Sequence, residues 1–292
     1  MLDSLKSAAC KACLYHPVLK EMITLPDPPE DEDEESGVGC KLLSKTQQKK
    51  TAKHQRGLEY KKSKRKLEQV KSREKYKEQR QLGGPSKDEI RSEQLSRMEA
   101  AKGVGIKVCI DFQFEHLMIE KELNHLVNQA KRVYSSNKSS SNPFDLHFIN
   151  LNKSSKTYSL CCEKNTGFEN YPLTFSENGA EEISCEDQIV YLSPDSDNVL
   201  ENLCPDSVYV IGGLVDDSVK KNTSLTFCRE AKITSSRLPI PEYMGRAQSG
   251  GSFKQILTIN QVFDVLLSFR ETGDWSLALS KNVPAKTGFV LR

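Results

Sequence analysis

Between residues 105 and 292, short runs of apolar and β-branched residues alternate with amphipathic segments, and this alternation constrains the fold more than any other feature. The runs that predict strands are 106–112, 145–151, 189–192, 208–215 and the edge segment 236–240. Helical spacing of apolar residues predicts helices over 118–134, 198–204, 224–231, 260–269 and 275–279. Strands that alternate with helices are typical of an α/β domain whose mostly parallel sheet is covered on both faces.

Charge is distributed unevenly along the chain, although the formal net charge at pH 7 is only +2. Residues 1–40 contain 3 Lys/Arg against 9 Asp/Glu, whereas residues 41–80 contain 16 against 4. Such asymmetry within one chain favours a polyanionic partner for the basic part. We expect the following organisation: a disordered acidic tail over 1–40, a basic helical arm over 41–82, a linker over 83–104 and one folded domain over 105–292.

Several classes of protein and site are disfavoured by composition. No apolar run approaches the length of a membrane span, and the first residues do not have the pattern of a secretory signal. The nine cysteines are scattered, which favours reduced thiols and a location in the nucleus, the cytoplasm or both. Cys10 and Cys13 have the only metal-like spacing, but no second pair completes a tetrahedral site, so we expect no metal.

Three predicted strand ends have unusual sequences, and ligands of open α/β sheets usually bind at such ends. They are LSPDS at 192–196, GGLVDD at 212–217, and RLPI at 237–240 together with ILTINQ at 256–261. Glycines let a ligand approach the backbone, and a neighbouring carboxylate accepts protons, but tight turns without a ligand use the same residues. The chain has no dinucleotide fingerprint, Walker A motif, G-x-S-x-G or H-E-x-x-H.

Taken together, four segments resemble the tRNA position-9 N1-purine methyltransferases of the SPOUT superfamily. The segments are VYLSPDS at 190–196, GGLVDDSVKKN at 212–222, RLPIPEYM at 237–244 and ILTINQVFDVLL at 256–267. The resemblance covers about residues 107–291, and the lysine-rich arm is similar to that of the family in character only. GRAQSGGSFK at 245–254 and the pair Asp217-Ser218 are similar to the B-type branch of this family.

The resemblance implies a SPOUT-type α/β methyltransferase domain with a C-terminal trefoil knot and S-adenosylmethionine as cofactor. It also implies a monomer and tRNA as the partner. The cofactor contacts that it implies are Leu192, Ser193, Gly213, Asp217, Ser218, Val219, Lys220, Lys221, Leu225, Leu238, Leu257, Thr258 and Ile259.

Asp216 matches the acid that serves as general base in the family. Guanine N1 carries a proton at neutral pH, so a carboxylate within hydrogen-bond reach would accept it during methyl transfer. Asp217 would raise the pKa of Asp216 by like-charge repulsion, and the sequence leaves open whether it shares the base role. Adenine N1 has no such proton, and specificity for adenine 9 or for both purines stays an alternative. A catalytically silent tRNA-binding protein is the alternative outside the enzymes.

The tRNA would be held largely through its phosphates, because nucleotide 9 lies within the folded core of tRNA. The basic arm suits such contacts, although a nuclear-import signal or a solvated helix has the same composition. The residues that we expect to bind RNA are Lys61, Lys62, Lys64, Arg65 and Lys66 in the arm, and Lys131, Arg132 and Arg246 in the folded domain.

Overall fold

The computed structural model describes residues 44–184, 188–215, 222–248, 253 and 255–292. Two compact units, Met1–Ser86 and Lys87–Arg292, make up the chain, and each is described by itself. The described part of the first unit, 44–86, contains the long helix α2 (Lys45–Gln81), in which no residue is buried. Its N-terminus is fixed by Ser44, whose N–H donates to Gln47 Oε1 at 3.0 Å while its hydroxyl accepts from Gln47 N.

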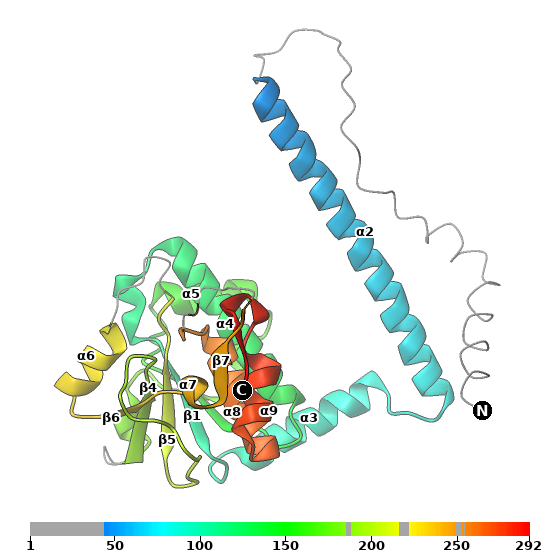
Figure 1. Cartoon of the computed structure of the whole chain (residues 1–292). Coiled ribbons are helices and arrows are strands. Elements are labelled where there is room, and N and C mark those ends of the chain that lie inside the picture. The colour runs from blue at the N-terminus through cyan, green and yellow to red at the C-terminus, as the bar shows by residue number, and fades with distance from the viewer. Residues whose placement is uncertain (1–43, 185–187, 216–221, 249–252, 254) are drawn as a thin grey trace. The chain divides into compact units, whose positions relative to one another are not determined.

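The second unit is built on a six-stranded parallel sheet in the order β3-β2-β1-β5-β4-β6 (Figure 1). Its strands are β1 (Lys107–Asp111), β2 (Asp145–Ile149), β3 (Thr174–Phe175), β4 (Ile189–Leu192), β5 (Val208–Gly212) and β6 (Thr234–Ser236). A separate antiparallel pair joins β7 (Met244–Arg246) to β8 (Phe289–Leu291). The central strands β1 and β5 are almost wholly buried, as expected for a parallel sheet between two layers.

Helices connect these strands. They are α3 (Lys87–Ala101), α4 (Glu120–Ser139), α5 (Lys156–Lys164), α6 (Thr223–Glu230), α7 (Ile240–Tyr243), α8 (Ile259–Thr272) and α9 (Trp275–Asn282). Short 3-10 turns lie at η2 (Gln113–Leu117), η3 (Phe168–Asn170), η4 (Ala180–Glu182) and η6 (Ala285–Thr287). Within the described ranges, no helix has both the length and the apolar character needed to cross a membrane.

Side chains of the central strands divide between two hydrophobic cores, one on each face of the sheet. Val108 and Ile110 of β1 pack with α4, α8 and α9, whereas Cys109 points to the other face and packs with Phe114 of η2 and Cys228 of α6. This division follows from the alternation of side chains along a strand. The predicted α/β class with a mostly parallel sheet is confirmed.

Three predictions of local structure are wrong. Residues 198–204, predicted as a helix, are irregular: Val199 bridges to Arg237, and Leu200 N donates to Arg237 O at 2.9 Å. The segment 236–240 is not a strand, because β6 ends at Ser236 and Pro239 precedes the short helix α7. Pairing of β5 ends at Gly212 rather than at residue 215. In the first two cases contacts from distant parts of the chain outweigh local propensity.

The predicted linker, 83–104, includes α3, whose Met98 is buried. The following turn is held by Asp145 of β2, whose carboxylate accepts from Gly103 N at 3.0 Å. Much of the predicted linker is therefore helix α3, and the turn after this helix is hydrogen-bonded to β2.

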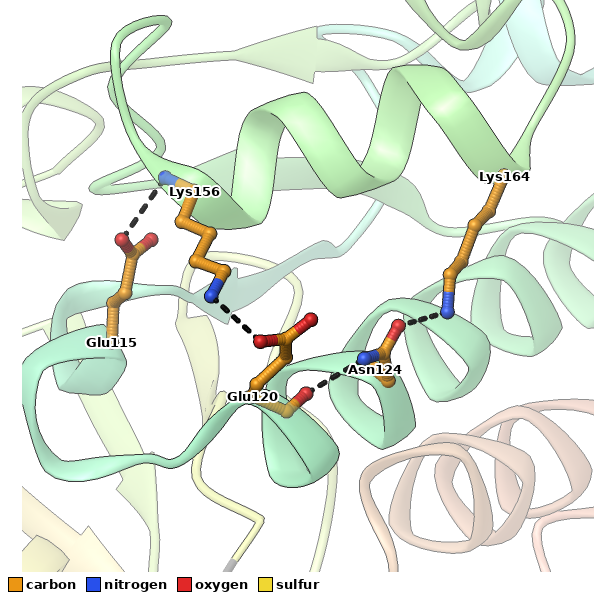
Figure 2. Close-up of polar contacts among 5 residues, drawn as sticks. All are labelled: Glu115, Glu120, Asn124, Lys156 and Lys164. Carbon is orange, nitrogen blue, oxygen red and sulfur yellow. Dashed lines mark hydrogen bonds and ion pairs between the residues drawn. The ribbon is translucent and has the colours of Figure 1, made fainter.

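Helix α5 is fastened to η2 and α4 by a set of polar contacts (Figure 2). Glu115 accepts from the backbone N–H groups of Lys156 and Thr157, each at 3.1 Å, and so caps the first turn of α5. Lys156 Nζ pairs with Glu120 at 3.2 Å, and the side chain of Lys164 donates to Asn124. Burial alone would raise the pKa of Glu115, but these hydrogen bonds outweigh it and lower the pKa.

Candidate functional site: a cavity at the carboxyl ends of three strands

A cavity lies where β4, β5 and β6 end, next to the first turn of α8. Its described lining is Leu192, Ser193, Pro194, Asp195, Ile211, Gly212, Leu214, Thr223, Ser224, Ser236, Arg237, Leu238, Ile240, Gln255, Ile256, Leu257, Ile259 and Val262. Five separate stretches of sequence therefore meet at the carboxyl edge of the sheet, where ligands of open α/β sheets usually bind. The lining is mainly aliphatic with a few hydroxyls and charged groups, which is the usual make-up of a small-molecule site.

Five of the residues expected to contact a cofactor line this cavity: Leu192, Ser193, Leu238, Leu257 and Ile259. Three other expected residues do not line it, namely Gly213, Leu225 and Thr258. Leu225 is buried in α6, and Thr258 is the residue immediately before α8. The other expected cofactor contacts lie outside the described residues; they are Asp217, Ser218, Val219, Lys220 and Lys221. Asp216, the expected general base, also lies outside them.

Gly213 has a packing role that differs from the expected ligand contact. Its N–H donates to the carbonyl oxygen of Asp111 at 2.7 Å, and a Cβ added here would lie 2.4 Å from the same oxygen. The chain after β5 therefore runs too close to β1 for any side chain at position 213. Gly212, its neighbour, lines the cavity instead.

Two contacts fasten the cavity-lining end of β4 to the start of α6. Ser193 and Ser224 share a hydrogen bond of 2.9 Å between their hydroxyls, and Asp195 accepts from Asn222 N at 3.0 Å. Asn222 has a left-handed backbone (φ 63°), which an asparagine tolerates better than most residues. These contacts fix Asn222, the first described residue after 216–221.

The one Arg side chain on the described cavity wall is neutralised. Arg237 makes a two-pronged ion pair with Glu242 of α7, with Nη1–Oε2 at 2.9 Å and Nη2–Oε1 at 2.7 Å. The hydrogen bond to Glu242 raises the pKa of Arg237, and the same contact lowers the pKa of Glu242. With this cation paired and Asp195 on the wall, the described lining does not favour a polyanionic ligand.

A buried carboxylate lies at the same edge of the sheet. Asp111 is 1% exposed and accepts from Asn150 Nδ2 at 2.8 Å, Tyr191 OH at 2.8 Å, and both the backbone and side-chain amides of Gln113. Burial raises the pKa of Asp111, and the hydrogen bonds oppose that rise. Four donors match the acceptor capacity of an ionised carboxylate. This cluster was not predicted, because Asp111 lies within the run 106–112, whose apolar pattern predicts a buried structural strand.

The first turn of α8 is held against α4. Ile259 N donates to Gln129 Oε1 at 2.9 Å, and Thr258 N donates to Gln261 Oε1 at 3.0 Å. Side chains of α4 and α8 thus satisfy two of the amides that the start of a helix leaves free. The loop that lines the cavity through Leu257 is fixed as a consequence.

The residues expected to bind RNA are all exposed. Lys61, Lys62, Lys64, Arg65 and Lys66 lie on α2 in the first unit. Lys131 and Arg132 lie on α4, where they border a hollow that is also lined by His125 and Asn128, and Arg246 ends β7. Among the described residues, no three His, Cys, Asp or Glu side chains are grouped so that they could hold a metal ion.

Comparison with known proteins identifies the family. The family model of tRNA (guanine(9)-N(1))-methyltransferase TRM10/TRM10A matches residues 41–288, which is most of the chain. The chain belongs to this family.

Individual relatives of the TRM10 family agree with that assignment. The chain is 38% identical to tRNA methyltransferase 10 homolog B of Bos taurus over 293 residues, covering 92% of each chain. It is 36% identical to the homolog B protein of Danio rerio over 253 residues, covering 85% of this chain and 81% of that one. The predicted similarity to the B-type branch is confirmed.

A solved structure of the family shares the fold. It is described as full-length spTrm10 in complex with SAH, and it is 30% identical, with a TM-score of 0.55 over 63% of this chain and 98% of that chain. The predicted SPOUT-type α/β fold class is confirmed. The trefoil knot stays a prediction.

Proposed function

We propose that this protein transfers a methyl group from S-adenosylmethionine to N1 of guanine at position 9 of tRNA. The observation that carries the proposal is the meeting of segments 192–195, 211–214, 236–240 and 255–262 around one cavity. These are the four segments in which the sequence resembles the TRM10 family. The family's curated members include enzymes named tRNA (guanine(9)-N1)-methyltransferase in Drosophila melanogaster and Schizosaccharomyces pombe.

The described lining fits S-adenosylmethionine. Aliphatic side chains of Leu192, Leu238 and Leu257 suit the flat faces of an adenine, and the serine hydroxyls offer hydrogen bonds to polar groups. Asp195 supplies negative charge, and the neutralised Arg237 does not oppose a positively charged ligand. When bound, the cofactor supplies an electrophilic methyl group on a sulfonium.

In this proposal the protein's own groups bind, orient and deprotonate. Asp216, immediately beyond the described end of the 188–215 stretch, accepts the N1 proton of guanine. On the N-terminal side of residues 216–221, the hydrogen bond from Gly213 to Asp111 fixes the backbone. On their C-terminal side, the hydrogen bond from Asn222 to Asp195 does so. Asp217, Ser218, Val219, Lys220 and Lys221 complete the proposed cofactor contacts, with Asp217 available to share the base role.

We further propose that α2 grips the phosphates of the tRNA. The helix carries 15 Lys/Arg against 4 Asp/Glu, and none of its residues is buried. At 1.5 Å per residue it spans about 55 Å, long enough to contact many phosphates. We also propose, from the sequence, that the protein acts as a monomer in the nucleus, the cytoplasm or both.

The test is methyl transfer from labelled S-adenosylmethionine to tRNA transcripts that carry G9 or A9. We expect incorporation into G9 only, and we expect Asp216→Asn to reduce it by about 10²- to 10⁴-fold. An Asp195→Asn variant is the matched control for loss of one carboxylate at the cavity, and it should retain more activity. Incorporation into A9 alone, or into neither transcript, would refute the proposal in favour of an adenine-directed enzyme or a silent tRNA-binding protein.

A further inference from the structure

A strained aromatic residue lies just before the loop that lines the cavity. Phe253 has φ 49°, a left-handed conformation that a bulky side chain adopts only when its surroundings impose it. Its N–H donates to Thr287 O at 2.8 Å, which ties it to the segment before β8. Backbone strain of this kind is concentrated at functional sites, so the ring's position calls for an explanation.

The strained backbone places the ring under an exposed cation. The guanidinium carbon of Arg246 lies over the ring of Phe253, 5.2 Å from its centroid, and Phe289 meets the same ring edge-on at 6.1 Å. Arg246 and Phe289 are register partners in the β7–β8 pair, and Ala247 N donates to Gly288 O at 2.7 Å. The three side chains therefore form one cluster beside the β7–β8 pair, with the ring of Phe253 between Arg246 and Phe289 in contact with both.

The guanidinium of Arg246 has no carboxylate partner among the described residues, in contrast to Arg237. It is exposed, and contact with an aromatic ring restrains its plane. A restrained, flat, exposed guanidinium is a group on which nucleobases stack, whereas a phosphate contact would use the charge and the N–H donors of the same group.

Phe253 shortly precedes cavity-lining residues along the chain. Gln255, Ile256 and Leu257, two to four residues after Phe253, line the cavity. Since a chain advances at most about 3.5 Å per residue, Phe253 is within about 7 Å of cavity-lining backbone, measured between the Cα atoms of residues 253 and 255. A purine whose N1 is methylated must leave its own stack, and enzymes that extrude a base commonly stack it on flat side chains.

We propose that the Arg246–Phe253 pair is the stacking platform for the target purine at position 9, with Arg246 in contact with the base and Phe253 as its support. This inference rests on the proposed tRNA methylation. It assigns Arg246 to base contact rather than to the phosphate contact expected from its charge.

The experiment compares Arg246→Lys with the wild type on two transcripts, one with G9 and one lacking the base at position 9. Because stacking of a base on a side chain favours binding, we expect removal of base 9 to weaken binding to the wild type about tenfold. Arg246→Lys keeps the positive charge but replaces the planar guanidinium with an ammonium group. It should bind the G9 transcript about tenfold more weakly and show no further loss when base 9 is absent.

The matched control is Arg229→Lys at the exposed end of α6, which should behave as the wild type on both transcripts. Phe253→Leu should resemble Arg246→Lys, whereas Phe253→Tyr should resemble the wild type. Binding of S-adenosylhomocysteine, measured for every variant, should not change, because the platform acts on RNA.

Two outcomes overturn the platform. One is wild-type binding of the G9 transcript by Arg246→Lys, because charge alone would then suffice. The other is that removal of base 9 still weakens tRNA binding tenfold in Arg246→Lys, because Arg246 would then contact another part of the tRNA. Methyl transfer by the same wild-type sample is scored separately, so failure of the proposed reaction is distinguished from failure of the platform.

Discussion

Gly213 shows how a single residue can shape the cavity without lining it. The chain leaving β5 hydrogen-bonds to Asp111 of β1, and an added Cβ would meet the Asp111 carbonyl oxygen at 2.4 Å. The oxygen belongs to the backbone of a central strand and the Cβ is bonded directly to the backbone of residue 213, so neither can move aside cheaply. The glycine is required by packing between two central strands.

We therefore expect Gly213→Ala to destabilise the second unit by about 1–3 kcal/mol, as overpacking of a well-packed interior does. Denaturant unfolding followed by intrinsic fluorescence of Trp275 in α9 measures this change. The control is Gly57→Ala on α2, where an added Cβ meets nothing within 4 Å and should leave that transition unchanged. A Gly213→Ala midpoint equal to that of wild type would show that the close approach is not maintained.

At the scale of residues, the sequence could predict which strand ends matter but not what each residue does there. The motif at 212–217 correctly indicated the end of β5, yet Gly212 rather than Gly213 lines the cavity. Two of the four donors around Asp111, Asn150 and Tyr191, come from other strands and their ends, which no local spacing encodes.

Among the elements, α5 has a cap supplied from outside its own sequence. Ser155 accepts from Tyr158 N at 3.0 Å, and Glu115 of η2 accepts from the next free amides at Lys156 and Thr157 (Figure 2). A carboxylate at a helix N-terminus also interacts favourably with the helix dipole. The contact links the segment after β1 to the helix after β2.

Replacing Glu115 with Gln should lower the free energy of unfolding by about 1 kcal/mol at neutral pH. Because the pKa of Glu115 is lowered in the folded state, its contribution is present above the unfolded pKa and is lost as pH falls through the folded pKa. The difference between wild type and Glu115→Gln should therefore shrink on acidification below the ordinary glutamate pKa of 4.5. Unfolding curves at several pH values test this, and a difference independent of pH would contradict it.

The predicted elements succeeded where periodicity was strong and failed where tertiary contacts decide. The strands β1, β2 and β4 and the helices α4 and α8 were all anticipated by apolar spacing. Residues 198–204 have helical spacing but serve as a bridge to Arg237 and accept from Trp275 Nε1 through Glu201 O. Helix α5 was missed because polar residues are mixed with apolar ones along its nine residues. Strand β3 was missed because it has only two residues.

For the whole molecule, the small net charge conceals two regions with different tasks. Helix α2 is strongly basic and none of its residues is buried, as expected of the phosphate-binding surface that we propose. The described cavity of the second unit has an aspartate and a neutralised arginine, as a site for a cationic cofactor should have. Chain length, charge and motif order predicted this division, whereas the trefoil knot came from resemblance alone.

The central claim is that the cavity between β4, β5, β6 and α8 holds the methyl-donor cofactor. Leu257 is half-buried on its wall, so Leu257→Trp should fill the cavity. Leu277→Trp adds the same indole on α9, where the side chain is 54% exposed. The measurement is calorimetric titration of each folded variant with S-adenosylhomocysteine. We predict at least about tenfold weaker binding for Leu257→Trp and wild-type binding for Leu277→Trp; equal affinity in all three proteins would contradict the account.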